Sequence, residues 1–265
     1  MLKFKDQCQR EVLLQDFPLR IVSTVPSQTE LLCDLGLEKQ LVGITAYCVH
    51  PKNLLSEKTI IGGTKNLNID LIRNLKPDLI IANKEENIKE QIEDLSQGIP
   101  VWISDVENFD QGLELISEIG KLTNTIEQAK LILKSIKKEL PKTEIQRPLK
   151  TLYFIWKNPF MLAGNSTYIG NMVEFNGLQN IAPKTEDRYP QIAFDKLKEL
   201  DPELILLTSE PYSFKSLEAH EIAQVFPNAL VKIVDGEMFT WYGSRMVLAM
   251  KYFSSLQKGI QLYFK

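Results

Sequence analysis

The chain has 265 residues, 44% of them hydrophobic and 25% charged, which is the composition of a globular protein with a sizeable core. Its formal net charge of −3 offers no basic excess, so the composition argues against nucleic acid as the main partner. No apolar run approaches the ~20 residues that a bilayer-spanning helix needs, so no membrane span is expected.

The first residues and the cysteines both bear on the compartment. Met1–Gln7 is charged and lacks the apolar core of a secretory signal. The three cysteines, Cys8, Cys33 and Cys48, are odd in number and lack metal-type spacing, which is typical of buried or free thiols in a reducing compartment. We therefore expect a cytoplasmic protein. The alternative is a periplasmic or cell-envelope protein whose leader has been removed.

Strands alternate with helices along the whole chain, after a leading hairpin over residues 3–15. Each strand is a short apolar run, and the helices between strands have apolar residues at three-to-four spacing. This alternation is typical of parallel sheets with both faces covered by helices. The expected strands are residues 19–23, 41–44, 79–82, 101–104, 150–154, 204–206 and 230–234.

Specific residues mark the boundaries of some helices. Ser27 and Glu30 have the spacing of a capping box, so we expect a helix to open there and to end at Gly36. A further helix is expected over residues 168–175, and Phe239–Arg245 leads into a C-terminal helix.

One block of sequence occurs twice. Residues 69–81, IDLIRNLKPDLII, align without a gap with residues 194–206, FDKLKELDPELIL. Each copy predicts a short amphipathic helix, a Pro that stops it, and an apolar strand. Asp70 and Asp195 recur at the same position, and we expect them to cap the two helices. Two similar α/β lobes are therefore predicted.

A long charged segment lies between the two copies. Thr123–Lys142 contains no Gly and no Pro until Pro141, and its apolar residues predict a helix of four to five turns. We expect this helix to join the lobes as a stiff strut, with little closure on ligand. The predicted division is an N-terminal α/β lobe over residues 1–122, the linking helix over 123–142 and a C-terminal α/β lobe over 143–265.

Several polar and aromatic residues follow predicted strands. In parallel sheets ligands bind at the carboxyl ends of the strands, so such residues outline a candidate site, and in two facing lobes they would line one cleft. The loop 45–52 carries Tyr47, Gly62–Lys65 precedes the first repeated block, Trp156 follows a strand, and Arg188 lies in the loop 183–191.

Five stretches together resemble a known family. They are Gln9–Val12, Arg20–Glu30, Gly62–Thr64, Leu75–Ile80 and Trp241–Arg245. The chain resembles the helical-backbone (class III) substrate-binding proteins of ABC importers, the group that carries vitamin B12, haem and ferric siderophores. The resemblance implies two lobes with a ligand held between them, an ABC permease as partner, and no catalysis.

The resemblance and the strand-end positions together nominate a ligand set. Trp241 and Tyr242 would form an aromatic platform, with Gly243 permitting close approach, or would pack the lobe edge. Tyr47 matches a position where B12 binders place a ring, and Tyr47 or Tyr242 is a candidate axial ligand of haem iron. Arg188 and Arg245 would pair with carboxylates of a chelate, although Arg245 would pair equally well with Glu237. The ligand-binding residues predicted are Tyr47, Thr64, Lys65, Trp156, Arg188, Trp241, Tyr242 and Arg245.

Glu86 is the candidate for docking onto the permease, because exported relatives use surface Glu residues for this. The alternative is a solvated Glu at the start of a helix, where the helix dipole favours it. A metal site built from protein side chains is not expected, because the only histidines, His50 and His220, fall on different lobes. No catalytic motif such as G-x-S-x-G, a P-loop or G-x-G-x-x-G is present, so we expect no enzyme.

The sequence thus predicts a monomeric two-lobed solute-binding protein for a cobalamin-type corrinoid, haem or a ferric siderophore. Two alternatives stay open. One is a cytosolic enzyme or chaperone that acts on a metal macrocycle, and the other is an interaction module without ligand.

Overall fold

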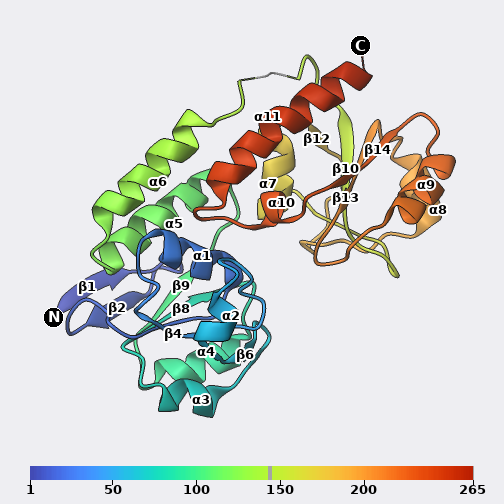
Figure 1. Cartoon of the computed structure of the whole chain (residues 1–265). Coiled ribbons are helices and arrows are strands. Elements are labelled where there is room, and N and C mark those ends of the chain that lie inside the picture. The colour runs from blue at the N-terminus through green and yellow to red at the C-terminus, as the bar shows by residue number, and fades with distance from the viewer. Residues whose placement is uncertain (143–144, 265) are drawn as a thin grey trace. The chain divides into compact units, whose positions relative to one another are not determined.

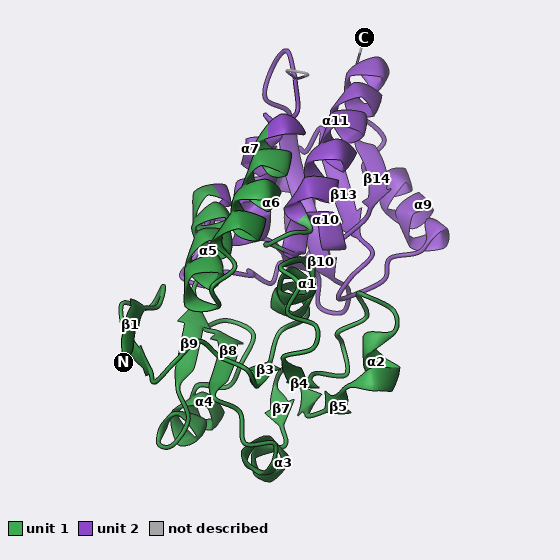
Figure 2. Ribbon diagram, turned by 60° about the vertical axis from the view of Figure 1, so that its left-hand side comes forward, with its two compact units in different colours: residues 1–106, 110–137, 242–245 green, residues 107–109, 138–241, 246–265 purple. Residues whose placement is uncertain are grey.

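The computed structural model describes residues 1–142 and 145–264, which form two compact units (Figure 2). Unit 1 comprises Met1–Val106, Asp110–Lys137 and Tyr242–Arg245. Unit 2 comprises Glu107–Phe109, Lys138–Trp241 and Met246–Lys265. Within the described residues no helix is both long enough and apolar enough to cross a membrane.

Unit 1 contains a parallel five-stranded sheet. Its strands, in spatial order, are β5 (Thr59–Ile60), β4 (Leu41–Ile44), β3 (Ile21–Ser23), β8 (Leu79–Asn83) and β9 (Val101–Ser104). Every residue of β8 is buried, which is why this strand is a continuous apolar run rather than an alternating one. The prediction of parallel sheets flanked by helices is confirmed.

Two hairpins and six helices complete the elements of unit 1 (Figure 1). The expected leading hairpin is present as β1 (Leu2–Lys5) and β2 (Glu11–Leu14), while Gly62–Lys65, expected as a loop, begins a short hairpin of β6 (Gly62–Gly63) and β7 (Asn66–Leu67). The helices are α1 (Pro26–Asp34), α2 (Leu54–Glu57), α3 (Ile69–Asn74), α4 (Lys89–Ser96), α5 (Phe109–Leu122) and α6 (Ile126–Lys138). The first residue of α5 and the last of α6 cluster with unit 2.

Unit 2 contains the second sheet. Its parallel strands are β12 (Gln179–Asn180), β10 (Lys150–Trp156), β13 (Leu204–Thr208) and β14 (Leu230–Val234), and β11 (Met161–Leu162) pairs antiparallel with β10. The helices are α7 (Tyr168–Phe175), α8 (Phe194–Glu199), α9 (Ser216–Val225), α10 (Glu237–Thr240) and α11 (Met246–Tyr263).

The sequence repeat is also a repeat of backbone structure. α3 and β8 in unit 1 correspond to α8 and β13 in unit 2, and the two strands occupy the same place in their sheets. Lys76 and Asp201, which end the two helices, both have a positive φ, of 48° and 46°. A left-handed residue followed by Pro ends each helix and redirects the chain into the strand.

Three predicted helix caps are wrong. Pro26 occupies the first turn of α1 and Val25 is the N-cap, so the helix opens before Ser27, and Ser27 and Glu30 form no capping box. The cap of α3 is Asn68, whose side chain accepts a hydrogen bond from Leu71 N, and α8 has no side-chain cap. Asp70 and Asp195 instead lie in the first turns of these helices, where the helix dipole favours a carboxylate.

The predicted linking helix is shorter than expected. α6 runs from Ile126 to Lys138, about 20 Å at 1.5 Å per residue. Asn124, with φ 57°, interrupts the chain before α6, and the helix ends ahead of Pro141 because the residue before a proline disfavours helical backbone. Residues 143–144 and 265 of the predicted C-terminal lobe lie outside the described part of the chain. The role of residues 123–142 as a strut stays a prediction.

Candidate functional site

Polar side chains gather where the strands of the unit 1 sheet end, which we call the carboxyl edge of unit 1. Thr24 follows β3, Thr45 follows β4, Asn83 ends β8 and Ser104 ends β9, and all four are buried. Parallel strands bring these ends to one side of the sheet, where ligands bind in open α/β folds. Thr24, Asn83 and Ser104 are joined with Asn87 in one hydrogen-bond network, while Thr45 Oγ1 meets Cys48 Sγ at 3.2 Å.

Asn83 and Asn87 are the centre of that network. Asn83 Oδ1 accepts hydrogen bonds from the backbone nitrogens of Glu85 and Glu86 at 2.9 and 2.8 Å, and its Nδ2 donates to Ser104 Oγ at 2.9 Å. Asn87 Oδ1 accepts from Thr24 Oγ1 and from Asn83 N, both at 2.8 Å. The two amides therefore fix the loop that follows β8.

Tyr47 lies in the loop after β4 and is 61% exposed. Its ring rests against Gly63, where an added Cβ would come within 3.1 Å of Tyr47 Cε2. An exposed aromatic ring supported on one side by backbone is suited to contact a flat ligand on its other side.

Thr64 and Lys65 lie in the turn of the β6–β7 hairpin. The carbonyl oxygen of Thr64 accepts a hydrogen bond from Asn87 Nδ2 at 3.0 Å. The exposed Lys65 side chain donates to the carbonyl oxygen of Glu85. Glu86 is exposed beside them. The structure therefore brings the predicted residues Tyr47, Thr64, Lys65 and Glu86 onto neighbouring loops of one edge.

Tyr242 and Arg245 have a different environment from the one predicted. The segment Tyr242–Arg245 packs on α1: an added Cβ at Gly243 would meet Leu31 Cβ at 3.4 Å and Ser27 O at 3.5 Å. Tyr242 is 7% exposed, and burial raises the pKa of its phenol, whose oxygen lies beside Ser27 and Ser104. The packing alternative therefore describes Tyr242 better than an aromatic platform does.

Arg245 is paired inside unit 1 with Glu30. The guanidinium donates two hydrogen bonds to the Glu30 carboxylate, at 2.8 Å from Nε and 2.5 Å from Nη2. Burial raises the pKa of Glu30, and the charge and hydrogen bonds of Arg245 oppose that shift. This pair anchors the chain segment that leads into α11.

Trp156 ends β10 at the carboxyl edge of unit 2 and is 39% exposed. Tyr212, which follows β13, meets it edge-to-face with ring centroids 5.5 Å apart, and Phe214 packs on Tyr212 at 4.7 Å. Glu218 accepts a hydrogen bond from the Tyr212 hydroxyl at 2.6 Å. The ring of Trp156 is thus supported from behind by a second aromatic side chain whose own position is fixed.

Trp241 and Arg188 occupy other places in unit 2. Trp241 is 9% exposed, and its side chain helps to lower the pKa of Glu210, whose carboxylate accepts a hydrogen bond from Thr240 Oγ1 at 2.7 Å. Burial raises the pKa of Glu210, and these two side chains oppose that shift. Arg188 Nη1 lies 2.7 Å from Glu107 Oε1, and both side chains are partly exposed.

The sequence did not point to Asn83, Asn87 or Tyr212 as site residues. Asn83 and Thr208 end the two repeated strands at equivalent positions. This equivalence is the sequence signal that could have identified Asn83 as a candidate site residue. In the described part of the chain, no group of three or more His, Cys, Asp and Glu side chains is placed to hold a metal ion.

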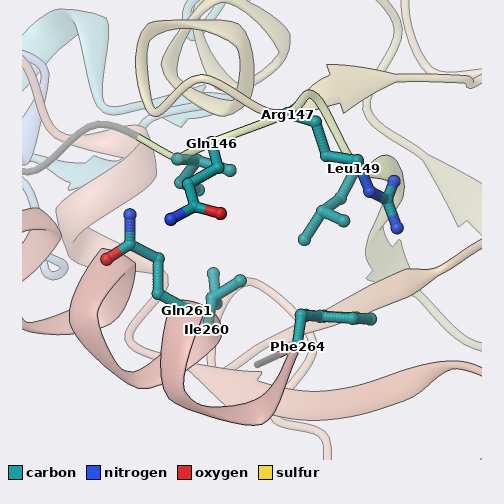
Figure 3. Close-up of a pocket in the computed structure, with 7 residues that line it drawn as sticks. Gln146, Arg147, Leu149, Ile260, Gln261 and Phe264 are labelled. Carbon is teal, nitrogen blue, oxygen red and sulfur yellow. The ribbon is translucent and has the colours of Figure 1, made fainter.

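A pocket of about 430 Å³ lies elsewhere in unit 2 (Figure 3). Its walls are the segment that leads into β10 and the C-terminal end of α11, from which Gln261 and Phe264 face Gln146 and Leu149. The start of β10 is the amino end of the sheet, opposite to where α/β sheets bind ligands. We therefore place the candidate site at the carboxyl edges.

A family model described as periplasmic binding protein matches residues 21–228, which cover both repeated blocks. The chain belongs to the periplasmic binding protein family. An uncharacterised ABC transporter substrate-binding lipoprotein of Bacillus subtilis (strain 168) is 27% identical over 261 residues, with 91% of this chain and 81% of that protein covered. A vitamin B12-binding protein of Yersinia pseudotuberculosis (strain YPIII) is 23% identical over 211 residues, with 78% and 75% covered.

Solved structures of periplasmic binding proteins share the fold. A periplasmic haem-binding protein from Roseiflexus is 17% identical with a TM-score of 0.76, covering 93% of this chain and 99% of that one. The names of the matched proteins describe a substrate-binding lipoprotein, a vitamin B12-binding protein and a periplasmic haem-binding protein. The expectation of a cytoplasmic protein is therefore wrong: periplasmic and lipoprotein relatives point to an extracytoplasmic location.

Proposed function

We propose that this periplasmic binding protein carries a bulky metal chelate to an ABC permease. The ligand class is a cobalamin-type corrinoid, haem or a ferric siderophore. The observation that carries the proposal is the pair of exposed aromatic rings, Tyr47 and Trp156, one at the carboxyl edge of each unit and each supported from behind. Relatives whose names specify vitamin B12 and haem support the same ligand class.

The ligand set that we propose is smaller than the sequence predicted. In unit 1 it consists of Tyr47, Thr64 and Lys65, and in unit 2 of Trp156 and Arg188. Lys65 and Arg188 supply positive charge for the carboxylates that haem and siderophores carry. Trp241, Tyr242 and Arg245 are left out, because they are buried and their polar groups serve contacts within one unit. We propose that they hold the segment before α11 in place.

The permease would dock on the acidic loop after β8. Glu85 and Glu86 form the exposed end of this loop, and Asn83 fixes their backbone. We propose Glu86 as the side chain that meets a basic residue of the permease. We further propose that the protein works as a monomer and leaves its ligand chemically unchanged.

The test is a titration with cyanocobalamin, dicyanocobinamide, haemin and ferrichrome, followed by visible absorption. We expect one of these classes to be retained at micromolar concentration and recovered unaltered by mass spectrometry. Tyr47→Ala and Trp156→Ala should each weaken binding by about 1–3 kcal/mol, by analogy with stacking of bases on aromatic side chains. Tyr263→Ala, which removes an equally exposed ring from α11, is the matched control.

Retention of none of the four at tens of micromolar would contradict the proposal. Conversion of a retained ligand would instead favour an enzyme acting on a metal macrocycle. Equal weakening by all three alanine variants would remove Tyr47 and Trp156 from the site.

A further inference from the structure

Two surface loops of unit 1 share one buried side chain. The first, which we call the Thr64 turn, is Gly63–Asn66 between β6 and β7. The second, the acidic loop, is Lys84–Glu86 after β8. Asn87 is 5% exposed and lies between them. Because the Thr64 turn carries proposed ligand contacts and the acidic loop the proposed permease contact, a link between them has a functional meaning.

The Asn87 amide joins the Thr64 turn to the strand ends that hold the acidic loop. Its Oδ1 accepts from Thr24 Oγ1 and Asn83 N at 2.8 Å each, and Asn83 in turn binds the backbone nitrogens of Glu85 and Glu86. Its Nδ2 faces the turn and donates to Thr64 O at 3.0 Å. An amide is the side chain that presents an acceptor and a donor in opposite directions, so neither a carboxylate nor an alkyl group replaces it here.

A second bond closes the connection on the exposed side. Lys65 Nζ donates to the carbonyl oxygen of Glu85. The Thr64 turn is therefore linked to this region by a buried bond from Asn87 and by an exposed bond from Lys65. The acidic loop itself is fixed from below by Asn83, which binds the nitrogens of Glu85 and Glu86. A displacement of the Thr64 turn is therefore resisted by the same residues that set the backbone of Glu85 and Glu86.

We propose that Asn87 is a positioning residue that couples the Thr64 turn to the acidic loop. Ligand contact with Thr64 and Lys65 then orders Glu85 and Glu86 within unit 1, which gives the permease a local sign of occupancy. This inference rests on the proposed function for its ligand and partner. The coupling itself is a property of the ligand-free protein.

Asn87→Asp removes the donor of the amide and keeps an acceptor. Aspartate keeps an acceptor toward Thr24 and Asn83 but places an oxygen against Thr64 O, so the bond to the turn is lost. Hydrogen-deuterium exchange of the full ligand-free chain is then measured in peptides covering residues 62–68 and 84–87. We expect exchange to accelerate about tenfold in both peptides, the effect of one buried hydrogen bond on local opening.

Asn180→Asp is the matched control. Asn180 is a buried amide in unit 2 that donates to Ala163 O at 3.0 Å and accepts from Ala182 N at 3.1 Å, so it suffers the same chemical change away from the loops. We expect it to leave both peptides unchanged. If Asn87→Asp does not fold, the neutral Asn87→Ala, which has no side-chain donor toward Thr64, takes its place.

Acceleration in residues 62–68 alone, in residues 84–87 alone, or equally in the control would overturn the coupling. A second arm adds whichever of the four chelates the protein retains. Wild-type protein should then gain protection in residues 84–87, and Asn87→Asp should lose that gain while still binding the chelate. If no chelate is retained, the proposed function fails while the ligand-free comparison still decides the coupling.

Discussion

Arg245 and Glu30 form a two-hydrogen-bond ion pair between residues that lie 215 positions apart in the chain. The two side chains are only 7% and 13% exposed, and both belong to unit 1. The last strand-to-helix connection of the chain is thereby fastened to α1, the first helix.

Removing the arginine should therefore destabilise the protein strongly. Arg245→Met leaves the Glu30 carboxylate buried without its partner, and we expect a loss of about 3 kcal/mol in the free energy of unfolding at pH 7. The loss should shrink as the pH falls, because the raised pKa of Glu30 lets its carboxylate protonate, which removes the buried charge. Urea unfolding at several pH values measures both effects.

Arg147→Met is the control for this experiment. Arg147 also pairs with a carboxylate, that of Glu203, through two hydrogen bonds, but its side chain is 60% exposed, so its loss should destabilise the protein much less than the loss of Arg245. Equal losses for the two variants would contradict the view that burial makes the Arg245 pair important.

The position of the Tyr47 ring should depend on the absence of a side chain at Gly63. In Gly63→Ala the new methyl group would lie 3.1 Å from Tyr47 Cε2, so the ring must move outward. We expect chelate affinity to fall about tenfold, near 1.4 kcal/mol, with little change in stability. Gly98→Ala places its methyl group in open space and should change neither quantity. An unaltered affinity in Gly63→Ala would show that the support of Tyr47 by Gly63 is irrelevant to binding.

Glu218 should make part of the stability of unit 2 depend on pH. The Tyr212 hydroxyl, the Lys215 backbone nitrogen and Lys157 all bind its carboxylate and lower its pKa to about 2. A depressed pKa contributes stability above the unfolded value near 4.5, and that contribution disappears as the pH falls toward 2.

Glu218→Gln should thus cost about 1–2 kcal/mol at pH 7, allowing for solvent screening, and almost nothing near pH 2. Thermal unfolding between these pH values, followed by circular dichroism, tests it. Glu221→Gln is the control, because Glu221 is more exposed and lies 3.5 Å from the same Lys157. A pH-independent difference between wild type and Glu218→Gln would show that the carboxylate charge is not responsible.

The sequence was sufficient for features that depend on neighbours along the chain. The spacing of the repeated blocks predicted two α/β halves, and the equivalent left-handed residues Lys76 and Asp201 show how deep the repeat runs. Tyr47 and Trp156 were found because they directly follow strands. Tyr242 also comes after a strand, β14, and the short helix α10, but whether its aromatic side chain packs inward depends on distant residues such as Ser27 and Ser104.

Pairings between distant residues could not be predicted from the sequence, because they too depend on how the chain folds. Nothing near Arg245 indicates Glu30, because the pair exists only once both segments are folded together. The role of Asn87 likewise depends on Thr24 and Thr64, which reach it from two other loops. Cap positions failed for a local reason, since Pro26 opens α1 before the expected cap.

Two glycines in helices of unit 2 should respond to the same substitution with opposite sign. Alanine is favoured over glycine within a helix by about 1 kcal/mol, and at Gly259 on α11 the added Cβ meets nothing within 4 Å. Gly259→Ala should therefore stabilise the protein by roughly 0.5–1 kcal/mol. At Gly170 on α7, however, the Cβ would lie 2.2 Å from Gly164 O, a backbone atom that cannot rotate away.

Gly170→Ala should consequently destabilise the protein by about 2 kcal/mol or more despite the gain in helix propensity. Gly164 N donates to Arg188 O at 2.9 Å, so displacing this loop also moves the backbone that carries Arg188. Urea unfolding of both variants gives the signs, and chelate titration of Gly170→Ala shows whether Arg188 matters to binding. A stabilising effect at Gly170 would mean that the loop before α7 yields easily, and Arg188 would then lack a fixed position.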